Sequence, residues 1–174
     1  MTTTLVAEIE RLAEALTEKD ALASLLGVAE RIAKLFHVEQ DEVAVLALCE
    51  QGRALRFLAP EKLREVGSIP LSTMNSLAAR TAREAHAQVL NDFAESRHIS
   101  VFQAVPQGRE KGEIIHKIMS VPVEADGHVV GVVQISRKGK TRPAAGPDFT
   151  PGDLKKLAAL TGALGKLVKL LPQT

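Results

Sequence analysis

The chain has 174 residues, 45% of them hydrophobic and 25% charged, and a formal net charge of +1. This balance fits one globular domain with a buried core, and a net charge so near zero gives no field to attract nucleic acid or an anionic membrane. The single cysteine, Cys49, excludes an intrachain disulfide and a multi-cysteine metal site. The start lacks a signal-peptide pattern, and no apolar run reaches the roughly 20 residues that span a bilayer. We therefore expect a cytoplasmic protein with no nucleic-acid or membrane partner.

A narrow apolar stripe, with spacings of four, three and four residues, opens the chain: Leu5, Ile9, Leu12 and Leu16. Such spacing is typical of a helix that pairs along a seam. We therefore expect residues 1–16 to be an N-terminal helix that makes a dimer. The alternative is a short helix that lies on its own domain.

A second helix is predicted over residues 17–36. Thr17 and Asp20 have the spacing of a capping box, in which each side chain bonds the backbone of the other residue. A wide apolar face follows, as expected for a helix that packs on a sheet: Leu22, Leu25, Leu26, Ala29, Ile32, Ala33 and Phe36.

Three strands are predicted next. Residues 43–48 are a short, almost unbroken apolar run, which suits a buried strand. Residues 53–58 alternate between polar and apolar side chains and predict the hairpin partner of that strand. Residues 68–71 are interpreted as a short third strand.

The middle of the chain predicts a helix over residues 76–87, a short strand at Val89-Leu90, and then a long irregular stretch from Asn91 to His116. Loops of this length inside compact domains are usually functional or disordered. Candidate ligand-binding residues in this stretch are charged or aromatic: Asp92, Phe93, Arg97, His98, Phe102, Arg109 and His116. The cations could pair with an anionic ligand, and the aromatic rings could wall its apolar part. The alternative is a solvated loop that is anchored by its phenylalanines.

A hairpin is the clearest pattern in the second half. Residues 118–123 and 128–137 are apolar strands, and Asp126-Gly127 between them favours a tight turn. Gly131, inside the second strand, predicts a bulge or the close approach of another backbone segment.

The last helix is predicted over residues 151–171. Thr150 serves as its N-cap, and Asp153 completes a capping box. An apolar stripe runs down one side of this helix, and we assign Leu164 and Leu171 on it, together with the first helix, to a dimer interface. The sequence therefore predicts a homodimer.

These elements predict an α+β domain with a central antiparallel sheet and helices at both ends. Three pieces resemble the GAF domain family: the helix-to-strand passage over residues 22–46, the hairpin with Ser120-Val121-Pro122 and Gly127…Gly131, and the helix entry Phe149-Thr150…Asp153-Leu154. The resemblance covers residues 17–171 as a single domain. It implies a six-stranded antiparallel sheet with helices on one face, and a ligand on the other face under the variable middle segment.

The resemblance implies a sensory or regulatory module rather than an enzyme. Such a module would bind an unidentified small molecule and signal through its terminal helices, to a dimer partner or to a separate signalling protein. The sequence names no cofactor, because the pattern of cyclic-nucleotide-binding members is absent and Cys49 does not lie where bilin-binding members attach their chromophore.

Two alternatives stay open. One is a dimerisation or interaction module with no small-molecule site. The other is a thiol-dependent redox enzyme that uses Cys49, as GAF-type methionine sulfoxide reductases use cysteines. A single cysteine would need an outside thiol to complete such a cycle. No metal site is predicted, because His86, His98 and His116 lack a recognisable ligand spacing.

Overall fold

The computed structural model describes residues 2–15, 17–95 and 113–171. Its helices are α1 (Thr2–Ala15), α2 (Glu18–Phe36), α3 (Leu77–Glu84) and α5 (Pro151–Lys169), with short 3-10 turns η1 (Gln40–Glu42), η2 (Glu61–Leu63) and η3 (Phe93–Glu95). Its strands are β1 (Val43–Cys49), β2 (Ala54–Ala59), β3 (Ser68–Pro70), β4 (Gln88–Leu90), β5 (Ile114–Ala125) and β6 (His128–Gly139).

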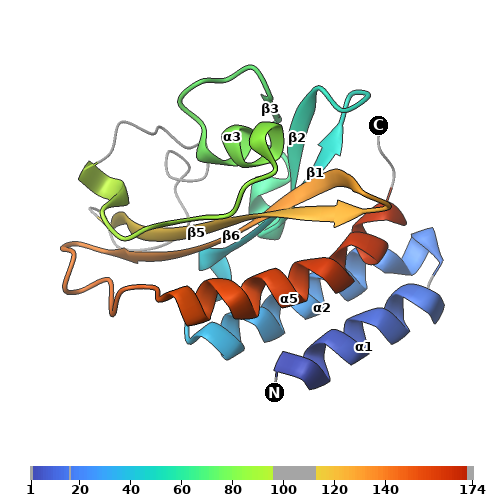
Figure 1. The fold of residues 1–174 in the computed structure, drawn as a ribbon, viewed down its shortest axis with the longest axis horizontal. Helices are drawn as coiled ribbons and strands as arrows, with labels where there is room; N and C mark the ends of the chain where they lie inside the picture. Colours follow the sequence, from blue (N-terminus) through green and yellow to red (C-terminus); the bar gives the residue numbers. More distant parts are fainter. Residues whose placement is uncertain (1, 16, 96–112, 172–174) are drawn as a thin grey trace.

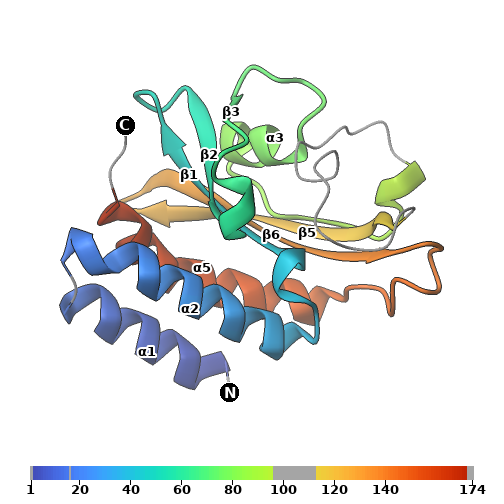
Figure 2. The same ribbon diagram turned by 180° about the vertical axis from the view of Figure 1, so that it is seen from behind.

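The six strands form one sheet in the order β3-β2-β1-β6-β5-β4, and every neighbouring pair is antiparallel. Figure 1 shows the sheet in the middle of the molecule, with α2 and α5 on one face and α3 on the other. Figure 2 shows from behind that α1 lies beyond α2 and α5, away from the sheet. The predicted α+β fold with a six-stranded antiparallel sheet is therefore confirmed.

The β5–β6 hairpin turns as its sequence predicts. Asp126 and Gly127 both have positive φ, +53° and +78°, as a type I′ turn requires. Further along β6, a Cβ on Gly131 would overlap the carbonyl oxygen of Leu46 in β1. The glycine thus permits the close backbone approach that its position in the strand predicted.

The start of α5 is set by a capping box, and its distance from the sheet is set by a glycine. The Thr150 hydroxyl accepts from the Asp153 backbone N–H over 3.1 Å, and the Asp153 carboxylate accepts from the Thr150 N–H over 2.9 Å. The predicted capping box is therefore present. Further along the helix, a Cβ on Gly165 would overlap the Glu124 carbonyl oxygen, so α5 approaches β5 as closely as a glycine allows.

Three local predictions need correction. Thr17 makes no side-chain cap for α2, because its hydroxyl points instead to the Asp20 carboxylate, 3.5 Å away. Strand β5 begins at Ile114, so His116 lies in the sheet and not in an irregular stretch. Strand β6 likewise continues to Gly139, because its last residues pair with the start of β5.

Candidate functional site

The two faces of the sheet bury different kinds of side chain. Over the centre of the sheet, the face toward α2 and α5, here called the helix face, is apolar, with residues such as Val45, Val121 and Val133. The face that α3 covers, here called the α3 face, buries polar groups among apolar ones. Ser120 of β5 and Gln134 of β6 are 0% and 1% exposed and pair across the two strands. A buried polar side chain needs hydrogen-bond partners to offset its lost hydration.

A directional hydrogen-bond chain crosses the α3 face from the sheet to α3. Gln134 Nε2 donates to Ser120 Oγ over 3.2 Å, and Ser120 Oγ lies 2.7 Å from Thr81 Oγ1. The Thr81 hydroxyl donates to the Leu77 carbonyl oxygen over 2.8 Å. Since a hydroxyl has one proton, Ser120 must be the donor to Thr81. The chain therefore fastens α3 to the two longest strands.

Polar side chains continue along β6 on the same face, and we call Gln134, Ser136 and Lys138 the polar stripe. Ser136 Oγ donates to the Glu42 carbonyl over 3.4 Å, and Lys138 Nζ donates to the Asp41 carbonyl over 3.3 Å. The Lys138 side chain is only 5% exposed. The polar stripe thus places an amide, a hydroxyl and an ammonium group in a row. The ammonium group already lies 3.9 Å from the Asp41 carboxylate, so the amide and the hydroxyl are the groups that can recognise a small polar molecule.

The sequence analysis selected none of these residues. Polar side chains at every second position of a strand normally predict a face in contact with water. Both faces of β6 are covered here, so that pattern marks buried polar groups. The alternation was visible in the sequence. What it meant became clear only from the sheet order, in which β6 pairs with a strand on each side.

The predicted ligand-binding residues are only partly described. Arg97, His98, Phe102 and Arg109 lie outside the described residues. Asp92 is exposed, while Phe93 is 1% exposed and packs in the apolar cluster of the α3 face. His116 Nε2 lies 3.0 Å from the Gly139 carbonyl oxygen at the end of the β5–β6 pair. Of the three described candidates, Phe93 alone is part of the buried α3 face.

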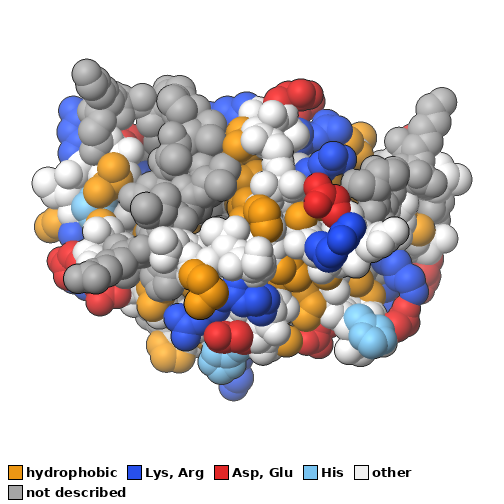
Figure 3. Space-filling model, turned by 90° about the horizontal axis from the view of Figure 1, so that it is seen from above, with side chains coloured by type: hydrophobic (Ala, Val, Ile, Leu, Met, Phe, Trp, Pro, Cys, Tyr) orange, Lys and Arg blue, Asp and Glu red, His pale blue; other side chains and the backbone are white. Residues whose placement is uncertain are grey.

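Figure 3 views the molecule from the α3 side. Cationic, anionic and hydrophobic side chains are mixed over the part of this surface that grey atoms leave visible. The visible described surface therefore offers no single-sign field that would select a strongly charged polymer.

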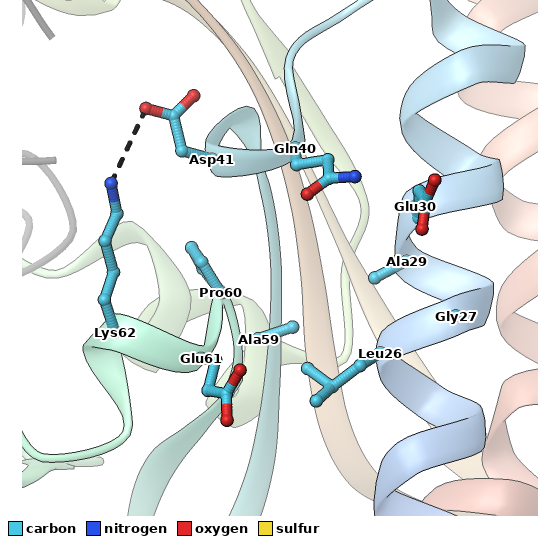
Figure 4. A pocket seen from close by; sticks show the side chains of 10 residues that line it. All are labelled: Leu26, Gly27, Ala29, Glu30, Gln40, Asp41, Ala59, Pro60, Glu61 and Lys62. Carbon is cyan, nitrogen blue, oxygen red and sulfur yellow. Dashed lines mark ion pairs between the residues drawn. The ribbon is translucent and has the colours of Figure 1, made fainter. Parts of the chain in front are cut away.

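A separate cleft of about 630 Å³ lies between α2 and the η1 and η2 turns. Figure 4 shows Leu26 and Ala29 of α2 on one side of it and Ala59 and Pro60 on the other. Three carboxylates also line it, those of Glu30, Asp41 and Glu61. Two of them are paired with cations, Glu30 with Lys34 at 3.2 Å and Asp41 with Lys62 at 4.0 Å. These pairs offset two of the three carboxylates that line the cleft.

The residues assigned to a dimer interface are used mostly within the chain. Leu5, Ile9, Leu164 and Leu171 are buried in the core of the helix face, and Leu12 is partly buried against that core. Leu16 lies outside the described residues. The apolar stripe of α1 thus packs on its own domain, so a dimer would need other surfaces of α1 and α5. Dimerisation itself stays a prediction.

Cys49 is buried at the end of β1 and is a free thiol. Burial is the main cause that raises its pKa, with the neighbouring Glu50 carboxylate adding to the effect. A raised pKa disfavours the thiolate, which is the reactive form. The surroundings of Cys49 therefore do not favour nucleophilic or redox chemistry at this thiol.

Two absences hold for the described ranges 2–15, 17–95 and 113–171. No group of three or more His, Cys, Asp or Glu side chains there could hold a metal ion. Within the same ranges, no helix has the length and apolar character to cross a membrane.

The sequence profile of the GAF domain family matches residues 20–167, which is most of the chain. The chain belongs to the GAF domain family. This membership confirms the resemblance seen in its three sequence motifs, and it supports a domain of the regulatory and sensory kind. No curated protein matches the sequence significantly.

Solved structures with the same fold match nearly the whole GAF domain. The GAF domain of a phosphoenolpyruvate-protein phosphotransferase from Coxiella burnetii has a TM-score of 0.70 at 12% identity, over 97% of this chain and 92% of that one. The corresponding domain from Acinetobacter has a TM-score of 0.67 at 17% identity, over 97% and 93%. Free methionine-R-sulfoxide reductase from Neisseria meningitidis, solved with its substrate, has a TM-score of 0.65 at 17% identity, over 97% and 89%.

The prediction that this domain is not an enzyme rested on the resemblance to the fold family, and it is wrong. Free methionine-R-sulfoxide reductases are GAF-fold enzymes, and several of them match this structure. The same sheet and helices can therefore carry catalysis as well as regulation. Activity has to be decided from the residues of the site and by measurement.

Proposed function

We propose that this GAF domain is a sensory module that binds a small polar molecule on its α3 face, at Ser120 and Gln134. Binding there would be reported through the terminal helices to a dimer partner or to a separate signalling protein. One observation carries the proposal, namely the connected polar chain that is buried in a face where apolar residues would pack as well. The cytoplasmic location and the homodimer remain predictions of the sequence.

The chemistry of the polar chain suits ligand recognition. The Gln134 side chain has two N–H donors and a carbonyl acceptor, and its amide donates to Ser120 among the described residues. A ligand that competes for this amide would bond to it in a low-dielectric site, where a hydrogen bond is electrostatically stronger than in water. The apolar neighbours Leu46 and Phe57 would contact the nonpolar part of such a molecule.

Native mass spectrometry of protein purified gently from its expression host tests the proposal. A small added mass that disappears on denaturation is the expected result, and its value identifies the molecule as an effector or a substrate. Gln134→Leu should remove that mass. Gln40→Leu is the matched control, because Gln40 is exposed and lines the cleft of Figure 4.

Adding the identified molecule back should raise the melting temperature. At 100 times its Kd, a ligand stabilises by about 2.7 kcal/mol, which corresponds to roughly 5–10 °C for a domain of this size. A mass lost in Gln40→Leu and kept in Gln134→Leu would instead place the ligand in the cleft. A clean apo mass together with no thermal shift from added metabolites would favour the interaction module.

A further inference from the structure

Residues 146–149, here called the α5 entry, lie in the connection between β6 and α5 and are held in place by side chains. Asn91 directly follows β4, and its side chain forms hydrogen bonds with both backbone groups of Phe149. Its Nδ2 donates to the Phe149 carbonyl over 3.0 Å, and its Oδ1 accepts from the Phe149 N–H over 2.8 Å. A single side chain thus replaces the pair of hydrogen bonds that a neighbouring strand would make.

Lys117 of β5 makes the second attachment to the α5 entry. Its side chain is 5% exposed, and its ammonium group lies 2.9 Å from Asp148 Oδ1. The same ammonium donates to the Gly146 carbonyl oxygen. A buried cation needs such partners, so the position of β5 and the position of the α5 entry depend on each other.

Phe149 then fixes where α5 begins. It is buried in the core of the helix face and immediately precedes the capping box at Thr150. The Arg137 guanidinium lies over its ring at 4.7 Å and also donates to the Phe36 carbonyl at the end of α2. Since α5 packs on α1, α2 and β5, Phe149 stands at the start of a helix that contacts both other helices of the helix face.

The strand register connects these attachments to the proposed ligand site. Ser120 of β5 pairs with Gln88 of β4. Asn91 follows Gln88 by three residues and Lys117 precedes Ser120 by three, so in this antiparallel pair both attachments lie toward the same end. The distance along the strands is roughly 10 Å. A change in β5 at Ser120 therefore has a short, contiguous route to the α5 entry.

We propose that Asn91 and Lys117 form a clasp on the α5 entry that transmits the state of the α3 face to the start of α5. This inference rests on the proposed function in taking the α3 face as the input site. It adds the route by which a molecule on one face of the sheet acts on the helices of the other face. The α5 entry has no regular secondary structure of its own, so its attachment to the sheet rests on side-chain contacts and not on a strand ladder.

A double-mutant cycle without ligand tests the clasp. Ser120→Ala perturbs the α3 face, Asn91→Ala opens the clasp, and amide exchange at Asp153 and Leu154 reports on the first turn of α5. In the wild-type background, Ser120→Ala should speed exchange at these amides about fivefold, the effect of one lost hydrogen bond. In the Asn91→Ala background, the same change should have less than about a twofold effect, because the route is already broken.

Equal effects of Ser120→Ala in the two backgrounds, or no effect on α5 in the first, would overturn the clasp. Asn75→Ala is the matched control, because Asn75 is exposed before α3, and the response to Ser120→Ala should persist in it. If Asn91→Ala does not fold, Lys117→Met provides the second background, since it keeps the length of the buried chain. No ligand enters this cycle, so native mass spectrometry can reject the binding proposal without deciding the clasp, and the reverse also holds.

Discussion

The helix face and the α3 face belong to the same six strands, but their interiors are built differently. The helix face is filled by aliphatic side chains from the sheet and from three helices, including Leu5 and Ile9 of α1. The α3 face is filled by a smaller apolar cluster that surrounds Thr81, Ser120 and Gln134. Stability near the helix face follows from area and close packing, whereas polar groups on the α3 face contribute little net stability.

This difference teaches where to look for function in such a domain. A buried polar network that could be exchanged for apolar side chains without loss of stability is not explained by folding alone. Among the described residues, the buried side chains of the helix face over the centre of the sheet are apolar, and a Cβ on Gly165 of α5 would overlap the Glu124 backbone. The following changes test the contrast between the two faces.

The largest effect is expected on the helix face, at α1. Ile9 is 0% exposed in the core, so Ile9→Ala should lower the free energy of unfolding by about 2–5 kcal/mol. Denaturant unfolding followed by circular dichroism measures this loss. If α1 served only a dimer, the variant would instead change the sedimentation coefficient and leave the unfolding midpoint at low protein concentration unchanged.

The next effect concerns the contact between α5 and β5. Gly165→Ala places a methyl group against the Glu124 backbone, which cannot yield as a flexible side chain would, and should cost about 1–3 kcal/mol. Gly162→Ala in the same helix is the control. It is exposed and its added methyl group meets nothing within 4 Å, so it should stabilise by about 0.5–1 kcal/mol through helix propensity. Opposite signs in thermal unfolding support the close packing, while two stabilising changes would contradict it.

On the α3 face, a triple variant should be more stable than a single variant. Additive contact energies would predict the opposite order. Ser120→Ala removes the acceptor of the Gln134 amide and the donor to the Thr81 oxygen, while the Thr81 hydroxyl keeps its bond to the Leu77 carbonyl. This change should cost about 1–3 kcal/mol. Replacing Ser120 by Ala, Gln134 by Leu and Thr81 by Val together should cost less stability than the single change, because none of these polar groups then remains unpaired. A triple variant that is much less stable than Ser120→Ala would mean that the polar chain is a stability device.

The sequence predicted the elements that depend on local rules. The Asp126-Gly127 turn, the close approach at Gly131 and the capping box at Thr150 all follow from the conformations that these few residues allow. Thr17 has the same motif spacing, but the capping predicted for it is absent. Its hydroxyl bonds to the Asp20 carboxylate instead of accepting from a backbone N–H. A motif of this kind states a preference that neighbouring groups can override.

The buried polar site could not be predicted from the sequence, and the reason is physical. Whether Gln134 faces water or protein depends on α3, which packs on this face from more than 50 residues earlier in the chain. The destination of the α1 stripe was equally ambiguous, since Leu5 and Ile9 suit a dimer seam and an intrachain core alike. Alternation and spacing identify a face of an element but not what covers that face.

The smallest expected effect is a difference in acid sensitivity between two ion pairs whose carboxylates are exposed. The hydrogen bond from Lys117 is the main cause that lowers the pKa of Asp148 below its ordinary value, and Lys117 and Arg142 add their charge. The pKa of Asp126 is lowered chiefly by its hydrogen bond to Lys169, whose side chain is itself exposed. A carboxylate with a depressed folded pKa stabilises above its unfolded pKa of about 3.9, and this contribution is lost as the pH falls through the folded value.

Asp148→Asn should therefore destabilise at pH 6 and have little effect once the pH lies below the folded pKa of Asp148. Asp126→Asn should show the same sign with a smaller amplitude, because an exposed partner is free to move into water and is screened by salt, whereas Lys117 is held at 5% exposure. Unfolding midpoints between pH 2 and pH 6, at low and high salt, measure both curves. If the two variants had equal, salt-sensitive profiles, Lys117 would act on the α5 entry as an ordinary surface charge, and only the Asn91 contacts would still tie that segment to the sheet.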